Sequence, residues 1–243
     1  MKKTVIPIVV ALILAVSFIL VANIASDTAM SIKNKGYVTV KGYAKQEITS
    51  DRGLFAVRLS AEDPDLQACY AKLADGKTKV MSYLEGKQKV SKTDIKIEPA
   101  GISEVYKVNE RGFDTDEFVK YILRQDIKVE SADVEKISDL SANIIELLEE
   151  GVLLAVYDPK YVYTKLEGLK IEMIGRATDN ARQRALKIAK EGKFHLGPIA
   201  SVRVGIFQIT PVNSTAVSNY GINDTSSIDK EIKCVVEIQY FVK

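Results

Sequence analysis

The sequence predicts an α+β fold with mostly antiparallel sheets and helices packed on them, after an N-terminal transmembrane helix. Stretches of alternating apolar and polar residues come in pairs separated by polar turns, as β-hairpins do. Stretches with apolar residues at helical spacing follow these pairs, and they do not alternate strictly with single strands. Together these patterns predict the order ββα-ββα-βα-ββ.

The first strand pair is predicted from period-two alternation over 37–44 and 54–61, with a polar turn between them. We interpret the pair as a β-hairpin. Asp63 then provides a helix N-cap and Pro64 the first helical position. Apolar residues recur at helical spacing from there to about Gln88, so the first helix is expected to end near that residue.

The second strand pair follows the same scheme. A strand from Ile95 to about Val108 and an alternating stretch over 118–129 predict a second hairpin, joined by a polar loop. A helix is expected to begin near Ser131, with one apolar face, and to end at Gly151.

The last third contains one long helix between strands. Residues 152–163 are β-branched or aromatic and predict an interrupted strand. Residues 164–167 match a capping box, in which the side chains of threonine and glutamate satisfy each other's free backbone donors. The helix that begins there is expected to run to about Lys190, and 199–210 and 231–242 are the last two predicted strands.

The N-terminal residues 1–26 differ sharply in composition from the rest. Val5 to Ala25 carries no charge over 21 residues, enough for a helix of roughly 30 Å, the thickness of a bilayer core. We expect an uncleaved, single-pass signal anchor with Lys2 and Lys3 on the cytoplasmic side. A cleaved signal peptide is the alternative, and the protein is then secreted or periplasmic.

The remainder is predicted to be a tether over 27–35 and one domain over 36–243, outside the cytoplasm at the cell membrane. The 243-residue chain has 34 basic and 32 acidic residues, so removing Lys2 and Lys3 leaves 32 of each. A neutral domain provides no general attraction for nucleic acid, and we expect no nucleic-acid partner.

Residues that carry catalysis are sparse. The chain has one histidine, His195, whereas zinc sites need three or four nitrogen or sulfur ligands, so we expect no metal and no cofactor. Neither a Gly-x-Ser-x-Gly turn nor a phosphate-binding glycine loop is present. We therefore expect no enzyme. Cys69 and Cys234 either form a disulfide or remain two buried thiols, and the sequence does not decide between these alternatives.

A polar cluster on the last helix is the first candidate interaction site. Asp179 and Arg182 are spaced i,i+3 on one face, and Arg184 points elsewhere. Surface ion pairing is the simpler interpretation of this cluster, and an anion site is the alternative.

The polar segment 211–229 is the second candidate, because it is long for a connection in a compact domain. Tyr220 is its aromatic candidate for contact with a partner. Asn223 and Asp224 offer oxygen ligands, but without the spacing of a calcium loop. A structured or partner-binding loop is favoured over a metal site.

Five segments, in order, resemble the SIMPL domain family. They are Val38–Ala44 (VTVKGYA), Lys92–Pro99 (KTDIKIEP), Val129–Val134 (VESADV), Ala177–Ala185 (ATDNARQRA) and Leu196–Ile199 (LGPI). The resemblance covers about 36–243 and implies a secreted, periplasmic or membrane-anchored bacterial protein without an established catalytic site. Some members are similar to ring-shaped or channel-like homo-oligomers. The chain departs from the family pattern at Ser50, where a proline is usual, and at 193–195.

The patterns and the resemblance together predict a non-enzymatic, membrane-anchored protein that self-associates and acts in envelope integrity or stress tolerance. The membrane, through residues 5–25, and a second copy of the chain are the expected partners. A ligand- or partner-binding envelope module is the alternative, and a carboxylate-based envelope hydrolase is a less favoured one.

Overall fold

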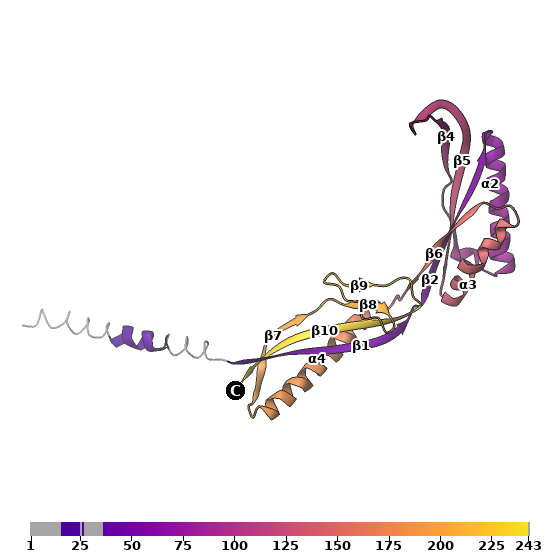
Figure 1. Ribbon diagram of the computed structural model, residues 1–243. Coiled ribbons are helices and arrows are strands. Elements are labelled where there is room, and N and C mark those ends of the chain that lie inside the picture. The colour runs from indigo at the N-terminus through magenta and orange to yellow at the C-terminus, as the bar shows by residue number, and fades with distance from the viewer. Residues whose placement is uncertain (1–15, 25, 27–35, 243) are drawn as a thin grey trace, which may run out of the picture. The chain divides into compact units, whose positions relative to one another are not determined.

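The computed structural model describes residues 16–24, 26 and 36–242 (Figure 1). Most of the predicted anchor and the whole tether lie outside the described residues. Residues 16–24 form a helix. Among the described helices, none is long and apolar enough to cross a membrane.

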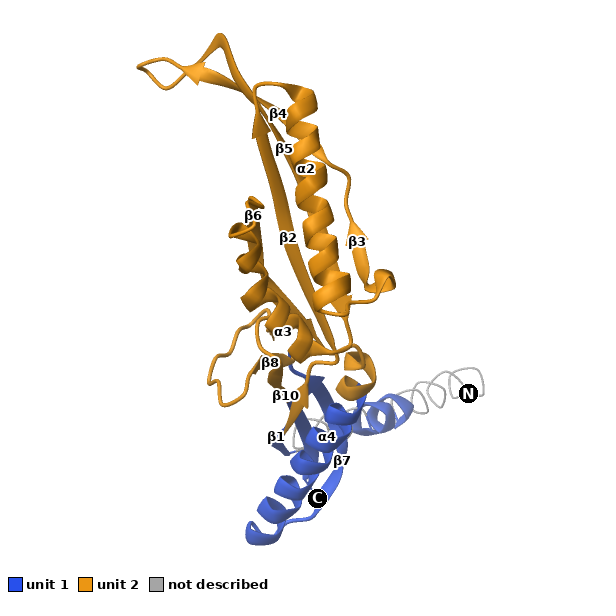
Figure 2. Cartoon of the chain, turned by 90° about the vertical axis from the view of Figure 1, so that its right-hand side faces the viewer, with its two compact units in different colours: residues 1–44, 171–206, 234–243 blue, residues 45–170, 207–233 orange. Residues whose placement is uncertain are grey.

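The fold is α+β with mostly antiparallel sheets, as predicted, and the described residues form two sheets of five strands each. The strands are β1 (Tyr37–Thr49), β2 (Arg52–Asp63), β3 (Ile95–Ile97), β4 (Gly101–Val108), β5 (Asp114–Ser131), β6 (Leu154–Val162), β7 (Leu196–Val204), β8 (Gln208–Pro211), β9 (Ile222–Asn223) and β10 (Asp229–Val242). The helices are α2 (Leu66–Met81), α3 (Val134–Asn143) and α4 (Leu166–Glu191), with short helical turns at Ser82–Lys87, Lys92–Asp94 and Ile144–Leu148. The chain divides into unit 1 (1–44, 171–206, 234–243) and unit 2 (45–170, 207–233) (Figure 2).

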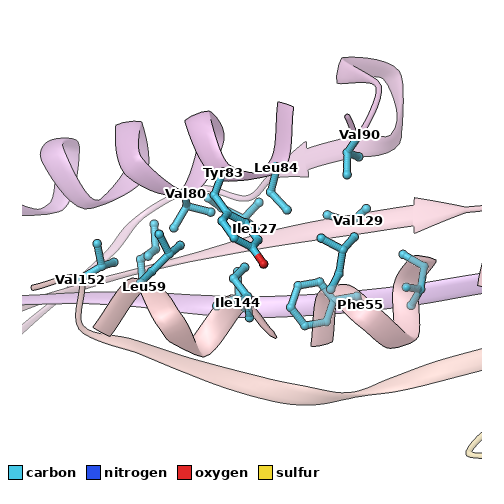
Figure 3. Packing of buried hydrophobic residues seen from close by; sticks show 14 of the residues in the cluster. Phe55, Leu59, Val80, Tyr83, Leu84, Val90, Ile127, Val129, Ile144 and Val152 are labelled. Carbon is cyan, nitrogen blue, oxygen red and sulfur yellow. The ribbon is translucent and has the colours of Figure 1, made fainter. Parts of the chain in front are cut away.

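In unit 2, the strands of one sheet run in the order β3-β5-β2-β6, and β4 also pairs with β5. Helices α2 and α3 cover one face of this sheet, where alternate residues of β2 are buried (Figure 3). The largest fully buried side chains of this core come from β2, β5, α3 and the short helical turns Ser82–Lys87 and Ile144–Leu148: Phe55, Val57, Leu59, Leu84, Ile127, Ile137, Leu140, Ile144 and Leu147. Burial of this set supplies the hydrophobic stabilisation of unit 2.

In unit 1, strands β1 and β7 lie on either side of β10, and α4 runs along the sheet (Figure 1). The buried side of α4 is a stripe of small residues at i,i+4 spacing, namely Ala177, Ala181, Ala185 and Ala189. Small side chains let the helix approach Gly42 on β1 so closely that a Cβ there would lie 1.9 Å from the carbonyl oxygen of Ala177. The alanine stripe therefore sets a short distance between helix and strand.

The prediction of a first β-hairpin over 37–44 and 54–61 is wrong, because β1 pairs with β10 in one sheet and β2 pairs with β5 and β6 in the other. The turn between them connects the two sheets. Its backbone groups pair with distant segments: the amide of Ser50 donates to the carbonyl of Ile228, and that of Asp51 to Val162.

Two predicted helix starts also differ from the structure. The N-cap of α2 is Asp65, whose carboxylate accepts from the amide of Ala68 at 2.8 Å, and not Asp63. The capping box at 164–167 does not form as predicted, because the amide and hydroxyl of Thr164 both donate to the carboxylate of Asp51 at 2.8 Å. A residue distant in sequence thus takes the acceptor role that the motif assigns to Glu167.

Other predicted elements are confirmed with small changes. Strands β4 and β5 form the second hairpin, although Pro99 lies in a break that separates β3 from β4. Helix α3 and its short extension end before Gly151, which has a φ of +78° that favours glycine. The predicted strand over 199–210 divides into β7 and β8. Cys69 and Cys234 are free, buried thiols, and burial raises the pKa of Cys234.

Candidate interaction surfaces

The polar cluster on α4 does not form the predicted ion pair. Asp179 and Arg182 are exposed, and no salt bridge joins them in the described part of the chain. Arg184 instead donates from Nη1 to the backbone carbonyl of Lys41, at 3.0 Å. One turn earlier, the side-chain oxygen of Asn180 accepts from the backbone amide of Tyr43, at 3.1 Å.

These two contacts protect the edge of a sheet. Strand β1 has β10 as its only partner strand among the described residues, so Lys41 and Tyr43 lie on an outer edge. Unpaired backbone groups on such an edge are a template for another strand, and proteins commonly block them. The side chain of Asn180 binds a backbone donor of this edge, and that of Arg184 binds a backbone acceptor. The cluster therefore has a structural role that its charges alone do not indicate.

The loop that contains Tyr220 is held in a defined conformation. The side-chain amide of Gln208 donates to the carbonyl of Ser218 at 2.7 Å, and the Gln208 side-chain oxygen accepts from the Ser218 amide at 3.3 Å. Next to this clamp, Tyr220 is 97% exposed. The loop thus presents one aromatic side chain to solvent from an anchored position.

Asn223 and Asp224 have different surroundings. Asn223 lies in β9, which pairs in parallel with β8. The carboxylate of Asp224 accepts from the amide and hydroxyl of Ser226, at 2.9 and 2.7 Å, and from the amide of Ser227, at 3.3 Å. Burial raises the pKa of Asp224, but these hydrogen bonds outweigh it and the pKa is lowered. Asp224 thus stabilises a turn.

Within 16–24, 26 and 36–242, no group of three His, Cys, Asp or Glu side chains is placed to hold a metal ion. The oxygens of Asp224 are already engaged by three donors.

A buried lysine beside this loop was not singled out in the sequence. Lys230 is 2% exposed and donates from Nζ to the carbonyl of Tyr161, at 2.5 Å. It lines a small cavity of about 50 Å³, together with Asp224 and Tyr161. Burial lowers the pKa of Lys230, and Asp224 opposes that effect. A lysine that follows an aspartate, as Lys230 follows Asp229, is typical of a surface segment, so the local sequence does not predict this burial.

Replacing Lys230 with methionine should change how stability depends on pH. Because the pKa of Lys230 in the folded protein lies below its ordinary value of 10.5, the unfolded chain binds more protons between these two values. The free energy of unfolding of the wild type, relative to Lys230→Met, should therefore rise as the pH increases towards 10.5. Urea unfolding of both proteins at several pH values measures this difference. A difference that stays constant or falls with pH would contradict the assignment.

The open face of the unit 2 sheet has a wide groove of about 1060 Å³. Its charged side chains largely compensate one another. Arg58 donates to both carboxylate oxygens of Asp126, at 2.7 and 2.9 Å, and Arg52 lies 3.6 Å from Glu130. These pairs leave the groove without a dominant charge that would select one class of ligand.

The hairpin of β4 and β5 extends beyond the rest of its sheet. Strand β2 pairs with β5 only as far as Asp63 opposite Tyr121, whereas β4 continues to pair with β5 out to Val108 opposite Asp114. Residues 105–120, here named the ribbon, therefore form only two strands with their turn (Figure 2). Its exposed apolar side chains are Val108, Phe113, Phe118 and Val119.

Strand β7 forms another exposed surface, which the sequence does not indicate. It pairs with β10, and no other described strand pairs with it. Its side chains Ile199, Val202 and Val204 are about half exposed. The sequence suggested a strand here, but an alternating pattern does not tell an edge strand from a central one.

These features define an α+β domain whose notable surfaces are an apolar ribbon, an open strand edge and an anchored loop. The model of the SIMPL family, described as a protein of unknown function (DUF541), matches residues 38–237. The chain therefore belongs to the SIMPL family. No curated protein matches it.

Proposed function

We propose that this chain is a non-enzymatic, membrane-anchored SIMPL-domain protein that self-associates outside the cytoplasm, in envelope integrity or stress tolerance. The observation that carries the proposal is the apolar ribbon. An isolated two-stranded hairpin is marginally stable in water, and additional packing stabilises it. Phe113 at its turn is 67% exposed, so most of the largest apolar group of the turn is in contact with solvent.

Composition and exposure at the N-terminus support the anchor. Val5 to Ala25 carries no charge. In the described helix 16–24, the apolar side chains Phe18, Val21 and Ile24 are more than half exposed. Water is an unfavourable environment for such a helix, and bilayer hydrocarbon is a favourable one. With Lys2 and Lys3 on the cytoplasmic side, the domain lies outside.

A second copy is the partner that we propose for the ribbon. Anchoring holds the copies near one surface and raises their effective concentration, so modest contacts between them suffice for assembly. Aromatic side chains at the centre of an interface contribute strongly to binding, and Phe113 has the size and exposure for this role.

Cross-linking in intact cells with a membrane-impermeant, amine-reactive reagent tests location and assembly together. The reagent reaches only lysines outside the cytoplasm, so the wild type should give products at multiples of the chain mass. Chains modified only as monomers would overturn self-association, and unmodified chains would overturn the location. The double variant Val108→Thr, Phe113→Ser should give clearly less cross-linked product than the wild type. Val217→Ser, which removes another exposed apolar side chain, is the matched control and should retain it.

A partner-binding module is the second candidate, and the anchored, exposed Tyr220 favours it. In that case Tyr220→Ala should abolish binding of the partner while leaving cross-linking between copies unchanged. The matched control is Tyr37→Ala, which removes another exposed tyrosine outside this loop.

A further inference from the structure

In unit 1, the outer strands β1 and β7 differ in whether side chains bind their outward backbone groups. On β1, Asn180 and Arg184 occupy the amide of Tyr43 and the carbonyl of Lys41. On β7, the opposite outer strand, the described residues provide no such side-chain cap on Val202 or Val204. One edge is thus blocked and the other remains open to a further strand.

The hydrogen-bond register shows which backbone groups of β7 face outward. The amide of Gly205 donates to the carbonyl of Val235 at 2.8 Å. Antiparallel pairs alternate between hydrogen-bonded and non-hydrogen-bonded positions. Since Arg203 opposes Glu237 and Ser201 opposes Gln239 in the same register, these two residues bond to β10. The amides and carbonyls of Val202 and Val204 therefore point to the open edge.

The side chains of this edge are suited to contact with another apolar strand. Val202 and Val204 are 49% and 47% exposed, and Arg203 is the only charged residue of β7. The pairing of β7 with β10 is irregular between Gln239 and Tyr240, and Pro198 lies beyond that irregularity. Ala200 has no partner on β10 in this register. Bulges and prolines limit strand addition, so the regular part available for pairing is 201–204.

We propose that β7 pairs antiparallel with β7 of a second copy, with the two-fold axis at Val202. This inference rests on the proposed self-association and names one of its interfaces. The two Val202 residues would exchange backbone hydrogen bonds across the axis, Ser201 of each copy would lie opposite Arg203 of the other, and the two sheets would become one continuous sheet.

The register follows from comparing the alternatives. An axis at Arg203 places two arginines directly opposite each other, which is unfavourable. An axis at Val204 extends the pairing beyond the end of β7. An axis at Val202 keeps the paired residues within β7 and places Ser201 opposite Arg203, so no like charges meet.

A second copy is the occupant because the strand complements itself. Pairing of β7 with β1 of another copy would require displacing Asn180 and Arg184 from the β1 backbone. That arrangement is also head-to-tail, and it grows into an open chain or a ring, whereas β7 with β7 closes after two copies.

Charged substitutions of Val202, at the axis, test the proposal by measuring dimerisation of the full chain in detergent. Val202→Lys places two lysines opposite each other and Val202→Glu two glutamates, so each variant alone should dimerise at least tenfold more weakly through this edge. A mixture of the two variants should recover the wild-type affinity, because unlike charges then meet at the axis. Thr39→Lys and Thr39→Glu, on the exposed side of β1, are the matched controls and should leave assembly unchanged. Near-ultraviolet circular dichroism checks that each variant is folded.

Oxidation of single-cysteine substitutions provides a second measurement that does not depend on charge. Val202→Cys should form an intermolecular disulfide, whereas Thr39→Cys should not. Wild-type self-association without recovery in the mixture and without this disulfide would overturn the β7 interface and leave the proposed function standing. A wild type that stays monomeric would overturn both.

Discussion

Replacing Gly42 with alanine is expected to destabilise the protein by about 3 kcal/mol or more, the upper range for overpacking. The added Cβ would lie 1.9 Å from the carbonyl oxygen of Ala177, 2.6 Å from the amide nitrogen of Ala181 and 2.7 Å from its Cβ. Two of these atoms belong to the backbone of α4, so they cannot rotate away as a side chain can. The helix must move off β1, and the stripe of buried alanines then loses its packing.

Urea unfolding followed by circular dichroism measures this effect. Gly36→Ala is the matched control, because a Cβ there would lie 3.8 Å from the Cβ of Val242, an ordinary contact. The control should unfold near the wild-type midpoint, and Gly42→Ala well below it. Equal midpoints for the two variants would contradict the close approach of α4 to β1.

Truncating Phe55 to alanine is expected to cost about 3 to 5 kcal/mol, the usual range for a buried phenylalanine. Phe55 is 2% exposed and extends from β2 into the core, near Val129 and Ile144 (Figure 3). Because interiors are close-packed, its removal leaves a cavity that the neighbours fill only in part.

The neighbouring residue provides the control for that measurement. Leu54 lies on the opposite face of the same strand and is 37% exposed, so Leu54→Ala should cost about 1 kcal/mol or less. Chemical unfolding of both variants separates a loss of core packing from a loss of strand propensity. Similar losses for the two would contradict the assignment of the helix-covered face as the core.

The fold could be predicted from the sequence where the determining contacts are local. Helical spacing located α3 and α4, and the pair of alternating strands around 109–113 located the second hairpin. The first hairpin was predicted wrongly because alternation identifies a strand but not its partner. Strand β1 pairs with β10 from the other end of the chain, and nothing in 37–44 records that choice.

The candidate surfaces depended more strongly on tertiary structure. The sequence singled out the cluster around Arg184, but its contacts are backbone groups of Lys41 and Tyr43, which have no sequence signature. Tyr220 was predicted as the aromatic residue of its loop for contact with a partner, and its side chain is exposed in the structure. The open edge of β7 follows only from the strand order, which no local pattern encodes.

Self-association is the central claim, and the mass of the purified full chain in detergent tests it most directly. Light scattering that separates the mass of protein from that of detergent should give a multiple of the single-chain mass at micromolar concentrations. That mass should fall towards one chain on dilution, and the double variant Val108→Thr, Phe113→Ser should have a lower mass than the wild type at the same concentration. A mass of one chain at every concentration would contradict the claim.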